Sequence, residues 1–358
     1  MTTLHGLGKR PLVLAVEPTN LLTYQAADNA LEFEVITASG EYKTCNAKSN
    51  PGLFWALKGG GGGTFAVVLS ATIRTFPEKR SSGAEFFINA THTEDPDVFW
   101  EGFRIFHKHS KHFVDSGLYT YFEVGGGVLR AKPFVAIDQS KEELEKVLAP
   151  MVKDLKKGKV PYELRLFEYD SLHDLYVDLF EPEGAGAFAI NGGWMFTRKD
   201  VETNNDAIVE AVKVQISPRP DLKNAGYIIG HLWNAGHKVP QRNSATHQAF
   251  RDGCDFMITT LIVPSNATLA EKKGYEDLVT DVMDPALRKA GPNGCTYVNE
   301  ADPFQDDWQE RFWGNDIYPE LKKTKEKLDP SGLFYAVSMP GTEEWEVIEY
   351  GTRLCKRM

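Results

Sequence analysis

The chain has 358 residues, of which 42% are hydrophobic and 25% charged, and its formal net charge is −10 at pH 7. These values are typical of a folded globular protein, and the length indicates about two domains. The negative charge, with no cluster of lysines and arginines to offset it, argues against a nucleic-acid-binding surface. No apolar run approaches the roughly 18 residues that a membrane-spanning helix requires, so no membrane span is expected.

Residues 1–25 show little periodic pattern, and the apolar run at 11–16 is too short for the core of a signal peptide. No secretion signal is therefore expected in this sequence. Two N-glycosylation sequons, beginning at Asn89 and Asn266, are weak indications of a secreted lineage. The cysteines lack zinc or redox spacing, which favours buried thiols, with one disulfide possible in a secreted protein. They are Cys45, Cys254, Cys295 and Cys355.

The N-terminal part predicts a small sheet beside a glycine-rich loop. Residues 31–36 alternate apolar and acidic side chains, as a half-buried strand does, and residues 41–45 are expected to pair back as a hairpin. Five consecutive glycines at 59–63 then separate an apolar patch at 53–57 from a buried strand expected at 66–73. Because glycine loses the most backbone entropy on folding, such a run indicates a backbone that approaches a ligand or another chain.

The run by itself leaves a flexible or packing loop as the alternative. It does not match the dinucleotide fingerprint GxGxxG, because Thr64 or Phe65 falls at the position of the last glycine. It does not match a Walker A loop either, because no Gly-Lys-Ser or Gly-Lys-Thr follows. The interpretation of the loop therefore depends on its flanks.

Strand and helix candidates alternate through the middle of the chain, which predicts an α+β domain whose helices cover one face of a sheet. Strands are expected at 84–90, 119–124, 128–136, 162–169, 188–196, 227–233 and 254–263. Helices are expected at 95–113, 141–157, 201–216 and 270–290. Residues 78–83 are expected to be a linker that opens this domain.

Two polar clusters in this region are candidate functional sites. His107, His109 and His112 do not fall on one helix face, and no nearby acid completes a metal site, so a solvated helix face is expected. The second cluster offers a carboxylate for proton transfer if the strand at 162–169 lines a pocket. A helix N-cap at Asp170 or Ser171 is the alternative. The members of this cluster are Glu168, Asp170, His173 and Asp174.

The C-terminal part predicts a short strand at 294–302, a helix at 306–328 and a second short strand at 333–337. The sequence DPSG at 329–332 is expected to end the helix sharply. Because strand residues alternate between faces, Tyr297 and Asn299 are expected on the same side of the first strand.

Residues 50–77, NPGLFWALKGGGGGTFAVVLSATIRTFP, resemble the glycine-rich segment of FAD-linked oxidases of the vanillyl-alcohol-oxidase, or PCMH-type, superfamily. The resemblance is closer to berberine-bridge-enzyme-like oxidases of the fungal type. Residues 26–42 resemble the strand pair before that segment, 296–302 the Tyr-x-Asn strand near the flavin, and 307–345 the C-terminal helix and DP-x-G-x-F turn. The Arg-x-x-Gly-Gly-His-Ser loop of the first half of the family's flavin site does not occur in the sequence.

The resemblance implies an α+β protein that contains the C-terminal part of a PCMH-type FAD-binding fold with an inserted antiparallel sheet backed by helices. Residues 1–80 would be the second half of the FAD-binding domain, and the N-terminal FAD subdomain would be lacking. Residues 81–290 would be the substrate-binding domain, and residues 291–358 a segment that returns to the FAD domain.

The resemblance also implies roles for single residues. Tyr297 would face the site as the general base, with Glu300 as the second candidate, and an ordinary half-buried strand tyrosine is the alternative for Tyr297. No metal is implied. The residues implied to contact FAD are Gly61, Gly62, Gly63, Thr64, Phe65, Val67, Val68 and Asn299.

The function that follows is an FAD-dependent oxidoreductase that passes a hydride from a small organic molecule, such as a sugar or a secondary metabolite, to the flavin, which O₂ then reoxidises. Two alternatives stay open because half of the cofactor site is not in the sequence. One is a non-catalytic pseudo-oxidase that binds a small molecule or a protein. The other is a cofactor-free lyase or cyclase that uses the same pocket.

Overall fold

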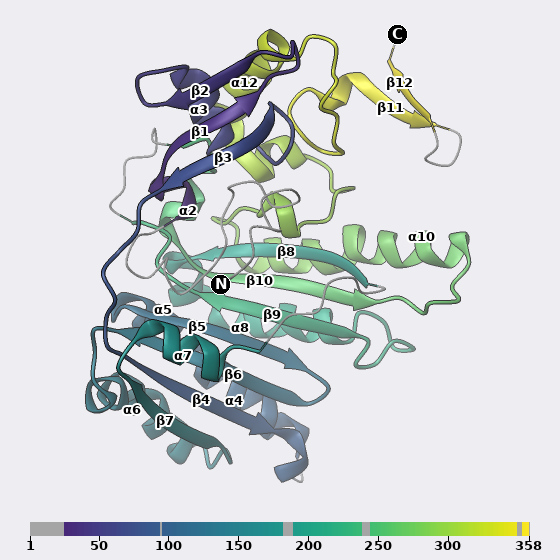
Figure 1. Cartoon of the computed structure of the whole chain (residues 1–358). Coiled ribbons are helices and arrows are strands. Elements are labelled where there is room, and N and C mark those ends of the chain that lie inside the picture. The colour runs from purple at the N-terminus through teal and green to yellow at the C-terminus, as the bar shows by residue number, and fades with distance from the viewer. Residues whose placement is uncertain (1–24, 94, 182–188, 238–243, 349–352, 358) are drawn as a thin grey trace.

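The computed structural model describes residues 25–93, 95–181, 189–237, 244–348 and 353–357. Within these ranges the strands form a three-stranded sheet, a seven-stranded sheet and a two-stranded ribbon (Figure 1). The strands of the small sheet are β1 (Ala30–Ile36), β2 (Tyr42–Asn46) and β3 (Val67–Ile73). Those of the large sheet are β4 (Ser81–Asn89), β5 (Leu118–Gly125), β6 (Val128–Ile137), β7 (Glu163–Tyr169), β8 (Ala189–Thr197), β9 (Gly226–Leu232) and β10 (Gly253–Ile262). The ribbon pairs β11 (Trp345–Ile348) with β12 (Arg353–Lys356).

Helices connect and cover these strands. In the N-terminal half they are α2 (Ala26–Asn29), α3 (Pro51–Leu57), α4 (Pro96–Lys108), α5 (Ser110–Asp115), α6 (Lys141–Lys157) and α7 (Leu172–Leu179). In the C-terminal half they are α8 (Arg198–Ile216), α9 (Ala249–Asp252), α10 (Leu269–Leu278), α11 (Asp284–Ala290) and α12 (Trp308–Leu328). Short 3₁₀ turns occur at Ala90–His92, Val298–Glu300 and Thr342–Glu344.

The small sheet is antiparallel in the order β2-β1-β3 and packs on α3 and α12. Its inner face follows from the alternation in β1, where Phe33 and Val35 are fully buried. They pack with Trp313 and Leu321 of α12, so the N-terminal and C-terminal parts of the chain share one core. Figure 1 shows this unit beyond the β8 edge of the large sheet.

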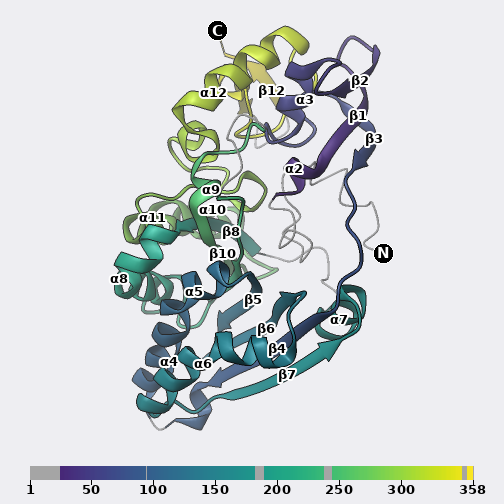
Figure 2. The same cartoon turned by 90° about the vertical axis from the view of Figure 1, so that its left-hand side faces the viewer.

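The large sheet has the strand order β7-β4-β6-β5-β9-β10-β8, and every pairing in it is antiparallel. Helices α4, α6 and α8 lie on one face, whereas α7 lies on the other (Figure 2). The helix-covered face holds the larger core, which is rich in phenylalanine. The prediction of an antiparallel sheet backed by helices is confirmed.

Helix α6 shows how closely local signals set an element here. Ser140 accepts a hydrogen bond from the backbone N–H of Glu143, whose side chain in turn accepts from the Ser140 N–H, which is a complete capping box. Leu144, Leu148 and Leu155 then recur at helical spacing and are fully buried. The helix has the predicted bounds of 141–157.

Two predicted strands are wrong. Residues 294–302 form only a single bridge, between Cys295 and Met195, and then a 3₁₀ turn at Val298–Glu300. Residues 333–337 form no strand because Asp329 captures their backbone: its carboxylate accepts from the N–H groups of Leu333 and Phe334, each at 2.8 Å. A side chain outside the segment therefore replaces the partner strand.

Two predicted helices are interrupted. The helix expected at 95–113 ends at Lys108, and His109 is the N-cap of the separate helix α5. The helix expected at 270–290 contains a π-helical turn at Val279–Met283 before α11 begins. In a π-helical turn the hydrogen bonds join residues five apart, so the helix is locally wider, and such turns are frequent at functional sites.

The expectation of a solvated histidine face is wrong for His107, which is fully buried. Its Nδ1 donates to Asn205 Oδ1 at 2.6 Å, because the Asn205 amide nitrogen is itself a donor to the Arg104 carbonyl. Its Nε2 lies 2.7 Å from Asp255 Oδ2, and burial raises the pKa of that carboxyl against the opposing effect of His107. His107 therefore joins α4, α8 and β10 across the core. The exposed member of the patch is His112.

The N-cap alternative for the polar cluster at 168–174 is confirmed. Ser171 is the N-cap of α7, so the polar cluster at 168–174 begins a helix, and Glu168 makes an ion pair with Arg80. All four cysteines are free thiols, and Cys45, Cys254 and Cys295 are buried. Among the helices of the described ranges, none is long and apolar enough to cross a bilayer.

Candidate functional site

The five glycines divide into two groups. Gly59, Gly60 and Gly61 are buried, and a Cβ atom on any of them would meet neighbouring atoms. At Gly59 it would lie 2.6 Å from the Ala245 backbone, and at Gly60 2.6 Å from the Leu321 side chain. At Gly61, which has φ of +93°, it would overlap the Met339 sulfur. These three glycines let the Ala245 backbone and the C-terminal residues Leu321 and Met339 pack directly on the loop, which is the packing alternative left open by the sequence.

Gly62 and Gly63 are different because they are at least partly exposed. Gly63 has φ of +66°, and a Cβ atom there would meet nothing within 4 Å. The backbone is therefore open on this side of the loop. A left-handed residue beside an open space is a conformation in which glycine lets a ligand approach the main chain.

The residues after the glycines point inward. The Thr64 hydroxyl donates to the Gly61 carbonyl at 3.0 Å, and Phe65 is fully buried. Val67 is exposed to 51% on the outer side of β3, and Val68 is partly buried against the core. Of the residues expected to contact a cofactor, the structure thus leaves Gly62, Gly63 and Val67 accessible, whereas Gly61, Thr64 and Phe65 offer at most backbone groups.

Tyr297 and Asn299 meet, although not on a strand. The 3₁₀ turn at Val298–Glu300 folds the chain back so that Asn299 Nδ2 donates to the Tyr297 hydroxyl at 2.7 Å. Tyr297 is 2% exposed, and its ring makes edge contacts with Phe250 and Phe256. Asn299 and Glu300 are partly exposed.

The turn lies between two cores. Tyr297 packs in the core on the α7 side of the large sheet, whereas Val298 and Ala301 pack against the core of the small sheet and α12. The turn therefore links the large sheet to the unit that holds the glycine loop. The backbone of α12 supports it, since the Thr296 N–H donates to the Arg311 carbonyl at 3.0 Å.

A row of side chains that the sequence analysis did not single out leads to this turn. Tyr121, His231, Phe256 and Met195 are successive cross-strand partners on β5, β9, β10 and β8, so they share one face of the sheet. Met195 forms the bridge to Cys295, two residues before Tyr297.

His231 is the histidine of this row and contacts three aromatic side chains. Its Nδ1 lies 3.0 Å from the Tyr119 hydroxyl, and its ring makes edge contacts with Tyr121 and Trp233. Trp233 is 1% exposed, and its indole N–H has no hydrogen-bond partner among the described residues. Strand alternation places His231 and Ile228 on opposite faces of β9, but only the strand pairing shows that His231 lies beside Phe256, whose ring contacts Tyr297.

Two buried carboxyl groups lie behind the turn. Burial, together with the smaller effect of the nearby Asp302, raises the pKa of Asp284 to about 8, against the opposing effects of Arg288 and the Gly193 N–H. Asp302 accepts a hydrogen bond from Thr280 at 2.6 Å. Asp284 therefore carries a proton at neutral pH. The Thr280–Asp302 hydrogen bond ties the π-helical turn to the segment after Glu300.

A buried ion pair ties the two sheets together beside the loop. Arg251 of α9 contacts Asp28 of α2 through two bonds, Nη1–Oδ2 at 2.7 Å and Nη2–Oδ1 at 2.9 Å. Lys58, directly before the glycines, is also buried, and its ammonium lies 4.8 Å from the centre of the Phe54 ring. Burial lowers the pKa of Lys58, against the opposing charge of Asp28.

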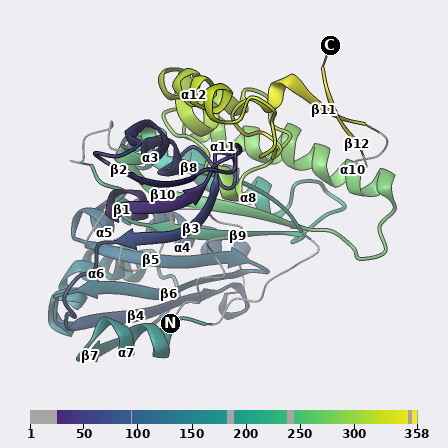
Figure 3. The same cartoon turned by 45° about the horizontal axis from the view of Figure 1, so that its top comes forward.

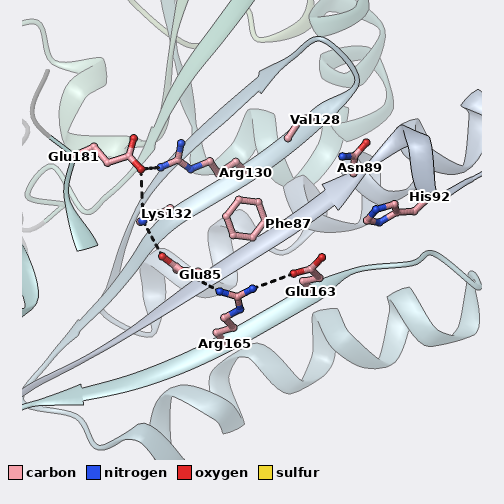
Figure 4. Close-up of a pocket in the computed structure, with 10 residues that line it drawn as sticks. All are labelled: Glu85, Phe87, Asn89, His92, Val128, Arg130, Lys132, Glu163, Arg165 and Glu181. Atoms are coloured by element: carbon pink, nitrogen blue, oxygen red, sulfur yellow. Dashed lines mark hydrogen bonds and ion pairs between the residues drawn. The ribbon is translucent and has the colours of Figure 1, made fainter. Parts of the chain in front are cut away.

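A hollow of about 480 Å³ lies on the face of the large sheet that carries His231, but near the β7 edge of that sheet (Figure 4). Phe87 lies at its centre, and ion pairs surround it, among them Lys132–Glu85 at 2.9 Å and Arg165–Glu163 at 3.5 Å. Five strand spacings of about 4.8 Å separate β4 from β8, which is about 24 Å. The hollow is therefore remote from Tyr297.

The described residues contain no group of three or more histidine, cysteine, aspartate or glutamate side chains that could hold a metal ion. The polar and accessible groups near the turn include Tyr297, Asn299 and Glu300, His231 in the cross-strand row, and the open backbone of Gly62 and Gly63. Viewed from above, as in Figure 3, the small sheet and α12 lie over the β8 and β10 side of the large sheet.

Comparison with known proteins gave matches along most of the chain. A family model described as "Berberine and berberine like" matches residues 296–337, which include Tyr297 and the whole of α12. The FAD-linked oxidoreductase patO of Penicillium expansum is 31% identical over 341 residues, which cover 92% of this chain and 57% of that protein. The FAD-linked oxidoreductase ZEB1 of Gibberella zeae is 29% identical over 335 residues, with the same two coverages.

The fold is also similar to a solved structure. The crystal structure of the VAO-type flavoprotein MtVAO615 from Myceliophthora thermophila C1 superposes with a TM-score of 0.87 at 27% identity. The match covers 98% of this chain and 63% of that one. The chain thus spans about 57% of the length of these two curated relatives.

Proposed function

Because the chain belongs to the berberine-bridge-enzyme-like group of the vanillyl-alcohol-oxidase superfamily, we propose that it is an FAD-dependent oxidoreductase acting on a small organic molecule. The family, the fold class and FAD as the cofactor, all predicted from the resemblance, are confirmed. We also propose the division into residues 1–80, 81–290 and 291–358, with the large sheet as the substrate-binding part.

The open backbone at Gly62 and Gly63 is the observation that carries the proposal. The other three glycines are explained by packing against Leu321, Met339 and the Ala245 backbone. Packing does not explain Gly63, because a Cβ atom there would meet nothing within 4 Å. Its φ of +66° lies in the left-handed region, which glycine adopts at little cost. A phosphate or ribityl group fits beside such a main chain, where N–H groups are free of side-chain cover.

The residues present therefore fit one side of an FAD site. Gly62, Gly63 and the backbone of Thr64 would hold the phosphate and ribityl part, and Val67 and Val68 would line the adenine end. Asn299 would contact the flavin or its ribityl chain from the other unit. The chemistry supplied by bound FAD is acceptance of a hydride from a substrate carbon, with O₂ as the proposed electron acceptor.

Tyr297 is the proposed proton acceptor. Asn299 donates to its hydroxyl oxygen at 2.7 Å, and a donor at that atom stabilises the negative charge that remains when the tyrosine proton leaves. Burial against Phe250 and Phe256 keeps water away from the oxygen and fixes the ring. Glu300 is the second candidate because a partly exposed carboxylate on the same turn is ionised more readily than a phenol.

Flavin binding by the purified chain tests the proposal. After incubation with FAD and removal of the excess, we expect an absorbance band near about 450 nm that the protein retains. Gly63→Ala places a methyl group in the cofactor space and is expected to weaken FAD binding by about tenfold or more. Gly126→Ala is the matched control, since Gly126 also has a positive φ, of +58°, and a Cβ atom there also meets nothing within 4 Å.

A chain that shows no flavin band and takes up no added FAD would overturn the proposal for this chain. The non-catalytic binding module would then be favoured, and a product assay without cofactor would test the lyase or cyclase. If FAD binds, Tyr297→Phe and Glu300→Gln identify the base, because loss of the true proton acceptor is expected to lower kcat by about 100-fold or more.

A further inference from the structure

One lysine fastens the glycine loop to the C-terminal helix. Lys325 lies on α12, and its side chain is 7% exposed. Its ammonium nitrogen donates three hydrogen bonds of 2.7 Å, to the carbonyl of Thr64, to Asp329 Oδ2 and to the carbonyl of Phe334. Lysine has three N–H donors, so all of them are satisfied inside the protein.

The acceptors of Lys325 come from three different segments. Thr64 ends the glycine loop, Asp329 follows α12, and Phe334 lies in the segment whose N–H groups Asp329 captures. Asp329 is itself fully buried at the side chain, and it also accepts from Ser331 and from the Leu333 N–H. Burying a charged pair is costly unless every donor and acceptor finds a partner, and here the partners are provided by loop backbone.

The backbone orientation of the glycine loop depends on the hydrogen bond from Lys325 to the Thr64 carbonyl. The Thr64 carbonyl is held by Lys325, and the Thr64 hydroxyl is held by the Gly61 carbonyl. Gly62 and Gly63 lie between these two fixed points and have no side chains of their own to hold them. The ammonium therefore limits how the two open glycines can turn.

Helix α12 holds the other part of the proposed site as well. The Arg311 carbonyl accepts from Thr296, next to Tyr297, and Trp313 Nε1 donates to the Gly59 carbonyl at 2.8 Å. One helix thus contacts the turn of the proposed base near its start and the cofactor loop at Gly59 and Thr64. While Lys325 bonds the Thr64 carbonyl, α12 sets the distance between Tyr297, the proposed base, and the glycine loop.

We propose that Lys325 is a positioning residue that fastens the Gly62–Thr64 backbone to α12 in the orientation required for an anionic cofactor group. The role rests on the proposed function only for the identity of that group, FAD. The fastening itself is a property of the chain that can be measured without flavin.

Hydrogen exchange of the loop amides tests the fastening. In Lys325→Met we expect the amides of residues 62–66 to exchange about tenfold faster or more, because the loop loses its bond to α12. Lys322→Met is the matched control, since Lys322 is on the same helix but bonds Glu343 at the surface. It is expected to leave these amides unchanged.

Loss of Lys325 alone leaves the buried Asp329 unpaired, and the single variant could unfold for that reason. The double variant Lys325→Met/Asp329→Asn removes both charges and keeps an oxygen acceptor at position 329. Faster exchange confined to residues 62–66 in the double variant supports the proposal. Loop amides that exchange at the wild-type rate, or acceleration that is equal across the whole chain, overturn it.

Titration with FAD separates the two proposals. If the wild-type chain binds FAD, Lys325→Met is expected to weaken binding about tenfold or more, whereas Lys322→Met stays within about twofold. Lys325→Arg is expected to recover part of the loss, because the guanidinium restores donors but not the geometry of three bonds from one atom. If the wild-type chain binds no FAD, the proposed function fails while the exchange data still decide the role of Lys325.

Discussion

Replacement of Asp284 by asparagine is expected to remove a pH dependence of stability. Burial raises the pKa of Asp284 from 3.8 to about 8, so the folded protein keeps a proton there that the unfolded chain releases near pH 4. Folding therefore takes up a proton between these two values, and the free energy of unfolding falls as the pH rises through this window. Asparagine has the shape of the protonated acid and does not titrate.

The size of the effect follows from the pKa difference. At 1.36 kcal/mol per pH unit the upper limit is ~6 kcal/mol across the whole window, and the loss between pH 5 and pH 7 is at most about 2.7 kcal/mol. Urea denaturation at several pH values measures it as the difference in slope between wild type and Asp284→Asn. Asp281→Asn is the control, because Asp281 is exposed on the preceding π-helical turn and is expected to leave the slope unchanged.

Wild type and Asp284→Asn that lose stability in parallel from pH 5 to pH 7 would contradict a protonated Asp284. Parallel curves would mean that Asp284 is ionised in the folded protein, with Arg288 outweighing burial and Asp302. A flatter curve for the variant, with stability at pH 7 at or above that of wild type, is the expected result.

Three further outcomes are expected. Gly61→Ala should cost about 2–5 kcal/mol in unfolding free energy, because it combines positive-φ strain with overlap at Met339. Gly63→Ala, which has only the strain, should cost about 1–2 kcal/mol, and equal losses for the pair would contradict the division of the glycines. His107→Ala should cost about 3–5 kcal/mol by thermal or urea denaturation, because it leaves Asp255 buried without its partner. A loss as small as that of His112→Ala on the surface would show that the pair contributes little.

The proposed site was only partly accessible to sequence reasoning. The resemblance pointed to Tyr297, Asn299 and the glycine loop, and the structure brings Tyr297 and Asn299 together through a hydrogen bond. It could not point to His231, because that residue reaches the row only through the pairing of β5, β9, β10 and β8. Lys325 also carried no signal, since a lysine near the end of a helix is usually a surface residue.

The sequence by itself determined the elements whose signals are local. Alternation specified β1, and a capping box with apolar residues at helical spacing specified α6 with its ends. These patterns suffice because their hydrogen bonds and buried faces involve residues only a few positions apart.

Only the tertiary structure decided the features that depend on distant partners. His107 is buried because both of its ring nitrogens have hydrogen-bond partners in the core. Asn205, 98 residues away, bonds Nδ1, and Asp255, 148 residues away, bonds Nε2. Residues 333–337 form no strand because the Asp329 carboxylate takes the N–H groups of Leu333 and Phe334 that a neighbouring strand would have taken. The first three glycines are packed because Ala245, Leu321 of α12 and Met339 lie against them, whereas Gly63 is open, and no pattern along the chain encodes those contacts.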